Sequence, residues 1–264
     1  MNDVEPILIN LPEDVEPKQI LARLDDALNA SPVDEAYFES METVVPGAGR
    51  VLGVRVPRLR ALAAQLGKAY RGQKTLLLDL ARGCWGRGTR EHRLIALFLL
   101  AGMKTLTPRE RWSMAEGFLP DVQDWETCDQ LCGALTGQAL AEDPAFMDGL
   151  EIWAGDPDFW VRRVAIVSTV LLRRAKFERG VARSLDERTL ELCDRLLDDE
   201  EKTIRKAVDW ALREVIKRSY ELGCSYLMQK GAEQPDYPAR ATLKLAAKKL
   251  MPADQYRFLK ILEA

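Results

Sequence analysis

Histidine is nearly absent from this chain of 264 residues, which contains only His92. The five cysteines are an odd number at scattered positions, and although Cys128 and Cys132 lie one helical turn apart, no second pair of Cys or His accompanies them. We therefore expect no metal site and no cofactor. Scattered, odd-numbered thiols also indicate reduced cysteines in a cytoplasmic compartment, such as a bacterial cytosol or nucleoid.

Long apolar runs and nucleotide-binding motifs are missing as well. No stretch near 18 residues is apolar and free of charge, so we expect no membrane partner. The acidic, proline-containing N-terminus does not resemble a signal peptide. The glycines form no GxxxxGK[ST] motif, which argues against a nucleotide cofactor. No heptad pattern or large apolar patch demands an assembly, and we expect a monomer.

Strand patterns are also lacking, because almost every segment repeats its apolar residues at the 3.6-residue period of a helix. Capping boxes at Thr107–Glu110 and Ser184–Glu187, and N-caps at Asp124 and Asp158, mark helix starts. The predicted helices span 17–30, 34–44, 57–70, 74–83, 89–104, 108–118, 125–140, 143–154, 159–175, 185–198, 200–218, 219–230, 237–250 and 252–262. A glycine-rich loop, PGAGRVLGVRV, occupies residues 46–56.

An internal sequence repeat indicates how these helices are arranged. Residues 160–174, WVRRVAIVSTVLLRR, align with residues 203–217, TIRKAVDWALREVIK, and His92-Arg93-Leu94 resembles a weaker third copy. Helices that begin with two exposed cations and continue with a small or branched face are typical of the inner helices of HEAT-like repeats. The sequence therefore predicts an all-α fold, a curved α-solenoid of stacked HEAT-like helical repeats. We expect a single domain, with an acidic segment and first helix at 1–33 and the repeats at 34–264.

Charge is strongly segregated, although the net charge is only −3. Residues 1–50 hold 3 basic and 11 acidic side chains, whereas residues 51–100 hold 10 and 2. A mildly acidic protein can still bind a polyanion when its basic residues share one face.

The stretch QDWETCDQL at 123–131 places Trp125 four residues before Asp129. An i, i+4 pair lies on one face of a helix, so an aromatic plane and a carboxylate project the same way. Such a pair suits a flat cationic group.

The leading turns of neighbouring predicted helices add cations and further aromatics. If the helices at 89–104, 125–140, 159–175 and 200–218 stack in register, one concave surface carries Arg90, Arg93, Trp125, Asp129, Trp160, Arg162, Arg163, Lys202, Arg205, Lys206 and Trp210. Cations interleaved with aromatic rings suit nucleic acid. Arg55 and Arg58 follow the glycine-rich loop and open a helix, where guanidinium and backbone N–H groups predict a phosphate clamp.

These residues resemble the AlkD type of alkylpurine DNA glycosylase, a family built of HEAT-like repeats. The similarity runs from about residue 35 to residue 250 and includes LGVRVPRLRALA, DWETCDQL, DFWVRRVAI and KTIRKAVDWALRE. The resemblance implies a partner, double-stranded DNA containing alkylated bases. It also implies hydrolysis of the N-glycosidic bond of cationic N3- or N7-alkylated purines, without flipping the base into a pocket.

The resemblance also assigns roles by position. Asp129 corresponds to the catalytic carboxylate, Trp125 and Trp210 to aromatic walls around the lesion, and Arg163 to a residue holding a backbone phosphate. Arg93, Arg162, Arg205 and Lys206 are further candidates for phosphate contacts. An alkylated purine already carries positive charge, so it needs no acid to leave, and a carboxylate can stabilise the oxocarbenium charge that develops on the sugar.

Three features depart from the family pattern and leave alternatives open. Ser40 stands where the family has a lesion-facing tyrosine, the glycine-rich loop is longer, and the first 45 residues are acidic. The chain could therefore be an inactive DNA-structure-binding protein or a protein–protein scaffold. Trp125 and Trp210 could pack between helices, Asp129 could pair with Arg163, and the cation pairs could form salt bridges between repeats.

Overall fold

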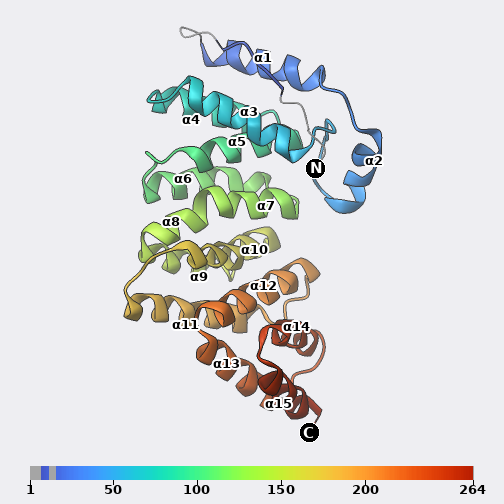
Figure 1. Cartoon of the computed structure of the whole chain (residues 1–264), viewed down its shortest axis with the longest axis vertical. Helices are drawn as coiled ribbons and strands as arrows, with labels where there is room; N and C mark the ends of the chain where they lie inside the picture. The colour runs from blue at the N-terminus through green and yellow to red at the C-terminus, as the bar shows by residue number, and fades with distance from the viewer. Residues whose placement is uncertain (1–6, 12–15, 264) are drawn as a thin grey trace. The chain divides into compact units, whose positions relative to one another are not determined.

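The computed structural model describes residues 7–11 and 16–263, and within these ranges the regular structure is entirely helical. The chain divides into two compact units, Met1–Leu135 and Thr136–Ala264. The predicted all-α helical repeat fold is confirmed (Figure 1). None of the described helices combines the length and apolar character needed to cross a membrane.

The first unit contains seven α-helices among its described residues. They are α1 (Pro17–Asn29), α2 (Glu35–Val44), α3 (Val56–Ala69), α4 (Lys74–Trp85), α5 (Arg90–Gly102), α6 (Pro108–Phe118) and α7 (Trp125–Leu131), with a 3-10 turn η1 at Leu119–Asp121. The π-helix η2, Cys132–Thr136, follows α7 directly.

Helix α5 is the centre of the first unit. Helices α3, α4 and α7 pack against it, and α1 covers α4 (Figure 1). Ile95, Leu97 and Leu100 are fully buried although they point in different directions around the helix. A helix that is apolar on all sides is stable only inside a core, which explains its central place.

The second unit is formed by the remaining helices. They are α8 (Gly137–Glu142), α9 (Met147–Trp153), α10 (Phe159–Ser168), α11 (Arg179–Leu196), α12 (Lys202–Arg218), α13 (Tyr220–Ala232), α14 (Ala239–Ala246) and α15 (Pro252–Glu263), with 3-10 turns η3 (Pro144–Phe146), η4 (Thr169–Arg174) and η5 (Ala247–Lys249).

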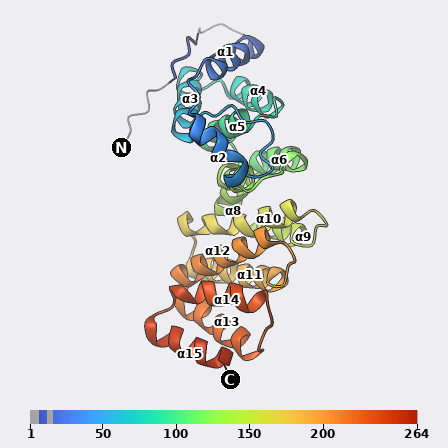
Figure 2. The same cartoon turned by 90° about the vertical axis from the view of Figure 1, so that its right-hand side faces the viewer.

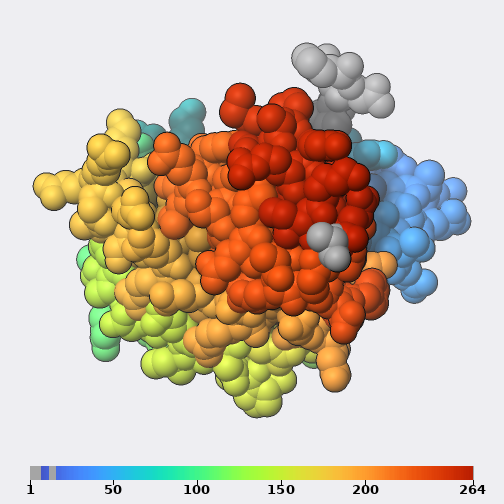
Figure 3. All heavy atoms as spheres, turned by 90° about the horizontal axis from the view of Figure 1, so that it is seen from below, coloured from blue at the N-terminus to red at the C-terminus, as the bar shows by residue number. Residues whose placement is uncertain are grey.

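Helix α12 has the same central role in the second unit. Helices α10, α11, α13 and α14 pack against it (Figure 2). Its buried residues Ile204, Val208, Ala211 and Val215 recur at intervals of three and four, as an inner helix requires. Helix α15 packs against α13 at the C-terminal end of this unit, which faces the viewer in Figure 3.

The helix starts follow the capping residues, with one exception. Thr107 and Glu110 form the predicted capping box, and the side chains of Asp124 and Asp158 accept hydrogen bonds from N–H groups of the first turn. The predicted capping box at Ser184 is wrong, because α11 already begins at Arg179 and places Ser184 inside the helix. No proline interrupts residues 179–183, so the helix can begin more than one turn before that signal.

Candidate functional site

Helix α7 carries the predicted pair of aromatic and carboxylate. Asp124 caps it, with Oδ1 accepting a hydrogen bond of 2.7 Å from the N–H of Thr127. Trp125 is 37% exposed, and its indole N–H donates to the carbonyl of Val44, the last residue of α2, at 2.8 Å. Asp129 follows one turn later and is half-buried. The hydrogen bond to α2 holds the N–H edge of the indole, while more than a third of the residue remains exposed.

The helix predicted over 125–140 is not continuous, because the π-helix at 132–136 interrupts it. The buried Arg111 donates to the carbonyl of Ala134 inside this segment at 2.9 Å, and to that of Met103 in the preceding loop at the same distance. A charged donor of this kind satisfies carbonyl groups where the regular helical ladder changes. Short π-helical segments inside helices are frequent at functional sites, and this one begins three residues after Asp129.

The glycine-rich loop lies directly against the start of α7. Gly47 has a φ of +86°, and a β-carbon built on it would lie 2.3 Å from the carbonyl oxygen of Gln123. Only glycine fits a left-handed backbone conformation in such close contact with another backbone. The loop and the residue before Asp124 therefore form one rigid surface.

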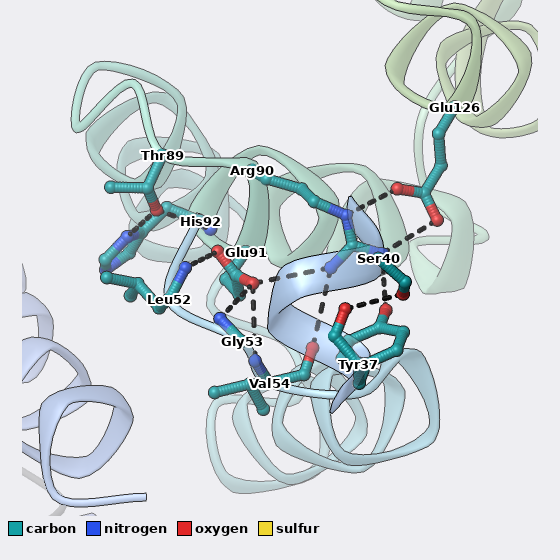
Figure 4. A network of polar contacts seen from close by, with 10 residues as sticks. All are labelled: Tyr37, Ser40, Leu52, Gly53, Val54, Thr89, Arg90, Glu91, His92 and Glu126. Atoms are coloured by element: carbon teal, nitrogen blue, oxygen red, sulfur yellow. Dashed lines mark hydrogen bonds and ion pairs between the residues drawn. The ribbon is translucent and has the colours of Figure 1, made fainter. Parts of the chain in front are cut away.

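A buried carboxylate holds the second half of the same loop. Glu91 is fully buried and accepts hydrogen bonds from the N–H groups of Leu52, Gly53 and Val54 at 2.9, 3.1 and 3.3 Å (Figure 4). These three N–H groups are therefore occupied by a carboxylate of the protein. The phosphate clamp predicted at the start of the next helix, with Arg55 and Arg58, stays a prediction.

Arg90 is also buried, with an exposure of 1%, so the expectation that it is an exposed cation is wrong. Its guanidinium bonds both carboxylate oxygens of Glu126, with Nε–Oε2 at 2.6 Å and a second bond of 2.9 Å, and reaches the hydroxyl of Tyr37 at 3.0 Å (Figure 4). Sequence reasoning missed Tyr37, Glu126 and Glu91, since nothing in their local patterns indicates burial.

The other candidate cations of the first unit have different surroundings. Arg55 is exposed and paired with Asp34 at 2.5 Å, and this guanidinium lowers the pKa of the Asp34 carboxyl. Arg58 is half-buried on α3. Arg93 lies over the ring of Trp85, 5.4 Å from its centroid. Trp85 is buried and stacked on Phe118, so it is a core residue.

The arginines of α10 bond to the neighbouring α12 region of the second unit. Arg163 is 5% exposed and donates to the carbonyl and hydroxyl oxygens of Thr203 at 2.5 and 3.1 Å. Arg162 bonds the carboxylate of Asp199 at 2.8 and 3.2 Å. Arg205 donates to the carbonyl of the same Asp199 at 2.9 Å. The ion pair of Arg162 with Asp199 is a salt bridge of the kind that the sequence left open as an alternative for the cation pairs. Arg163 instead bonds neutral oxygens of Thr203, and Arg205 bonds a carbonyl group in the turn before its own helix.

Lys206 is exposed on the first turns of α12, and Trp210 is half-buried one turn later. The structure thus brings Trp125 and Asp129 together on α7 in one unit. In the other unit it places Arg162 and Arg163 on α10 next to the helix that carries Arg205, Lys206 and Trp210. The predicted role of Arg163 and Trp210 beside the carboxylate of Asp129 stays a prediction.

Ser40 lies on the exposed side of α2, and its hydroxyl donates to the carbonyl of Tyr37 at 2.7 Å. All five cysteines are reduced, and burial raises the pKa of the Cys84 thiol to about 12. Within the described ranges, no group of three or more His, Cys, Asp or Glu side chains is placed to hold a metal ion.

The sequence of the chain was compared with models of known protein families. The model of a DNA alkylation repair enzyme matches residues 27–250, which is most of the chain. The chain belongs to the DNA alkylation repair enzyme family. The match extends from the end of α1 to the residue after η5 and so includes α2, the glycine-rich loop, α7, α10 and α12. A search of curated proteins finds no significant match.

Proposed function

We propose that this protein acts in the repair of alkylated DNA as a glycosylase that hydrolyses the N-glycosidic bond of cationic N3- or N7-alkylated purines in duplex DNA. Membership of the DNA alkylation repair enzyme family supports the role in repair. The specific chemistry rests on residues of α7.

The observation that carries the proposal is the pairing on α7 of Trp125 with Asp129. The first is an exposed aromatic side chain with a fixed N–H edge, and the second is a half-buried carboxylate one turn later. An aromatic face attracts a cationic ring by roughly 0.5–2 kcal/mol, depending on how far the pair is desolvated. A carboxylate within the same turn adds attraction for positive charge that develops nearby.

In the proposed reaction, the bond between the sugar C1′ and the purine nitrogen breaks. The electron pair of that bond leaves with the base and neutralises its positive charge, so no proton donor is needed. Asp129 stabilises the positive charge that forms on the sugar and orients a water molecule, whose oxygen forms the new bond to C1′ and whose proton is released. The products are a free alkylpurine and an abasic site.

The release of a modified base from DNA tests this proposal. A duplex oligonucleotide with one N7-methylguanine is incubated with excess protein, and free base is measured by chromatography. Replacing Asp129 by asparagine should slow release by about 10²–10³-fold, the loss found when one stabilising group is removed from a reaction centre. Asp79→Asn is the matched control, because Asp79 is a solvent-accessible carboxylate on α4 paired only with Arg82 in the part of the chain that the structure describes.

Affinity for undamaged duplex should be retained or increased in Asp129→Asn, because a negative charge is removed from a DNA-facing surface. The proposal fails if the wild-type protein releases no alkylpurine, or if Asp129→Asn releases it at the wild-type rate.

One observation favours a second function, binding of DNA without base excision. An exposed serine, Ser40, stands where the family has a tyrosine, and its hydroxyl donates to the carbonyl of Tyr37 in the same helix. A protein of this kind would bind duplex or branched DNA with a strong dependence on salt and release no base. The same base-release assay, run beside a binding titration at several salt concentrations, separates the two functions.

A further inference from the structure

Helix α7 is a seven-residue stretch that passes directly into the π-helix. Most of the stability of a helix in a folded protein comes from tertiary packing, so the contacts of α7 with neighbouring segments determine where it lies. The direction in which Trp125 and Asp129 project depends on those contacts.

Arg90, in the first turn of α5, forms a bidentate ion pair with Glu126 of α7. Glu126 presents both carboxylate oxygens to this guanidinium at 2.6 and 2.9 Å, and the exposed fractions of the two side chains are 12% and 1%. A bidentate arginine–carboxylate pair has a strict planar geometry and loses much of its energy when either partner shifts. Because the pair is buried, losing one partner leaves an uncompensated charge.

The same guanidinium bonds two further segments and the neighbouring residue of its own helix. It reaches the hydroxyl of Tyr37 on α2 at 3.0 Å, the carbonyl of Val54 in the glycine-rich loop at 3.5 Å, and the carboxylate of Glu91 at 3.4 Å (Figure 4). Glu91 in turn holds three N–H groups of that loop. One side chain therefore links α2, the loop, α5 and α7.

The position of Glu126 in α7 means that its pair with Arg90 also fixes the rotation of the helix about its own axis. Successive residues of an α-helix are rotated by about 100° around its axis. Glu126 follows Trp125 by one residue and precedes Asp129 by three, so fixing the direction of Glu126 also fixes the directions of the indole and the carboxylate. Rotation of α7 about its axis would have to break the bidentate pair.

We propose that Arg90 is a positioning residue for the α7 face formed by Trp125 and Asp129, acting through Glu126. This inference rests on the proposed function for its effect on base release, whereas the mechanical link to α7 is independent of any reaction. Arg90 itself contacts neither DNA nor the leaving base, because it is buried beneath α2 and the loop.

The kinetic test uses Arg90→Lys, Glu126→Gln and the double variant. Lysine keeps the positive charge but has no planar fork to bind two oxygens at once. We expect each single variant to slow single-turnover release of N7-methylguanine by at least about tenfold, with less than a twofold change in the affinity for undamaged duplex. The double variant should be no slower than the slower single variant, because both changes break the same link.

A second measurement, hydrogen exchange without DNA, reports the link directly. In Arg90→Lys, amide exchange should accelerate by at least about tenfold in residues 123–131 and 51–54, with unchanged exchange in α3. Arg87→Lys is the matched control, because Arg87 bonds the carboxylate of Asp25 through three contacts and bonds no residue of α7 in the described structure. If a buried lysine prevents folding, the double variant Arg90→Met, Glu126→Met replaces it, since it removes both charges of the bidentate pair while Glu91 keeps its three backbone N–H donors.

The outcomes separate the two proposals. If the wild-type protein releases no base but Arg90→Lys accelerates exchange in α7, the link stands and the proposed function fails. If the wild-type protein is active while Arg90→Lys matches it in both release rate and exchange, the positioning role of Arg90 is refuted. A loss of DNA affinity equal to the loss of rate would also refute it, because a group that only orients α7 should affect the chemical step more than binding.

Discussion

Replacing Gly47 by alanine tests how closely the glycine-rich loop is bound to the start of α7. Gly47 has a φ of +86°, and an added β-carbon would lie 2.3 Å from the carbonyl oxygen of Gln123, well inside the 3.0 Å that real β-carbons keep. Gly72 is the matched control, because its φ of +88° is the same within two degrees but nothing lies within 4 Å of its added β-carbon. Both glycines belong to the first unit and report on the same unfolding transition.

The expected magnitudes follow from these two environments. The left-handed conformation costs an alanine about 1–2 kcal/mol at either position. The contact with Gln123 adds about 1–3 kcal/mol at Gly47 alone, the usual cost of forcing extra volume into a packed site. We therefore expect Gly72→Ala to lower the free energy of unfolding by about 1–2 kcal/mol, and Gly47→Ala by about 2–5 kcal/mol. The gain from a stiffer unfolded chain is equal for the two variants and cancels in the comparison.

Urea unfolding followed by circular dichroism measures this difference. The slope of the free energy against urea should be the same for both variants and the wild type, which would show that stability and not compactness has changed. Equal decreases in the free energy of unfolding for the two variants would refute the reasoning. The loop would then move away from Gln123 at no measurable cost. If the loop does move, base release should also slow in Gly47→Ala, since the same loop supports α7.

Two further predictions concern stability alone. Burial lowers the pKa of the His92 imidazole from its usual 6.5 despite the nearby Asp25 carboxylate, so the folded chain keeps this ring neutral while the unfolded chain binds a proton. The free energy of unfolding should therefore fall as the pH decreases from 7.5 to 5.5, and His92→Gln should lose that dependence in urea titrations at each pH; an unchanged slope would contradict it. Thr107→Ala should cost about 1 kcal/mol through loss of its capping box, whereas Ser184→Ala, inside α11, should change the free energy by less than about 0.5 kcal/mol in thermal unfolding. A larger effect at Ser184 would mean that α11 starts there after all.

The fold was accessible from the sequence because helix signals are local. The 3.6-residue period, the capping box at Thr107 and the N-caps at Asp124 and Asp158 each depend on residues within one or two turns, and all mark real helix starts. Ser184 shows the limit of such signals. A capping box is a preference worth about 1 kcal/mol, and it does not exclude a helix that begins more than one turn earlier, as α11 does at Arg179.

Only part of the candidate site could be predicted from the sequence, because many of its contacts join residues that are far apart in the chain. Trp125 and Asp129 could be placed on one helix from their spacing. The burial of Arg90 could not be predicted from the sequence. The local sequence around an arginine in the first turn of a helix is the same whether the side chain faces solvent or pairs with a carboxylate 36 residues away. The position of Glu91 beneath the loop likewise depends on contacts almost forty residues apart in the chain.

The three bonds that Glu91 accepts also restrict how this chain can change during evolution. Residues 52–54 present their N–H groups to one buried carboxylate, and an insertion or deletion among them would shift at least one donor away and leave part of a buried charge unsatisfied. Relatives that keep a glutamate at this position should therefore keep the length of this segment. Relatives with a longer or shorter segment should carry a different residue in place of the glutamate. We therefore expect the length of residues 52–54 and the glutamate at position 91 of α5 to vary together among relatives.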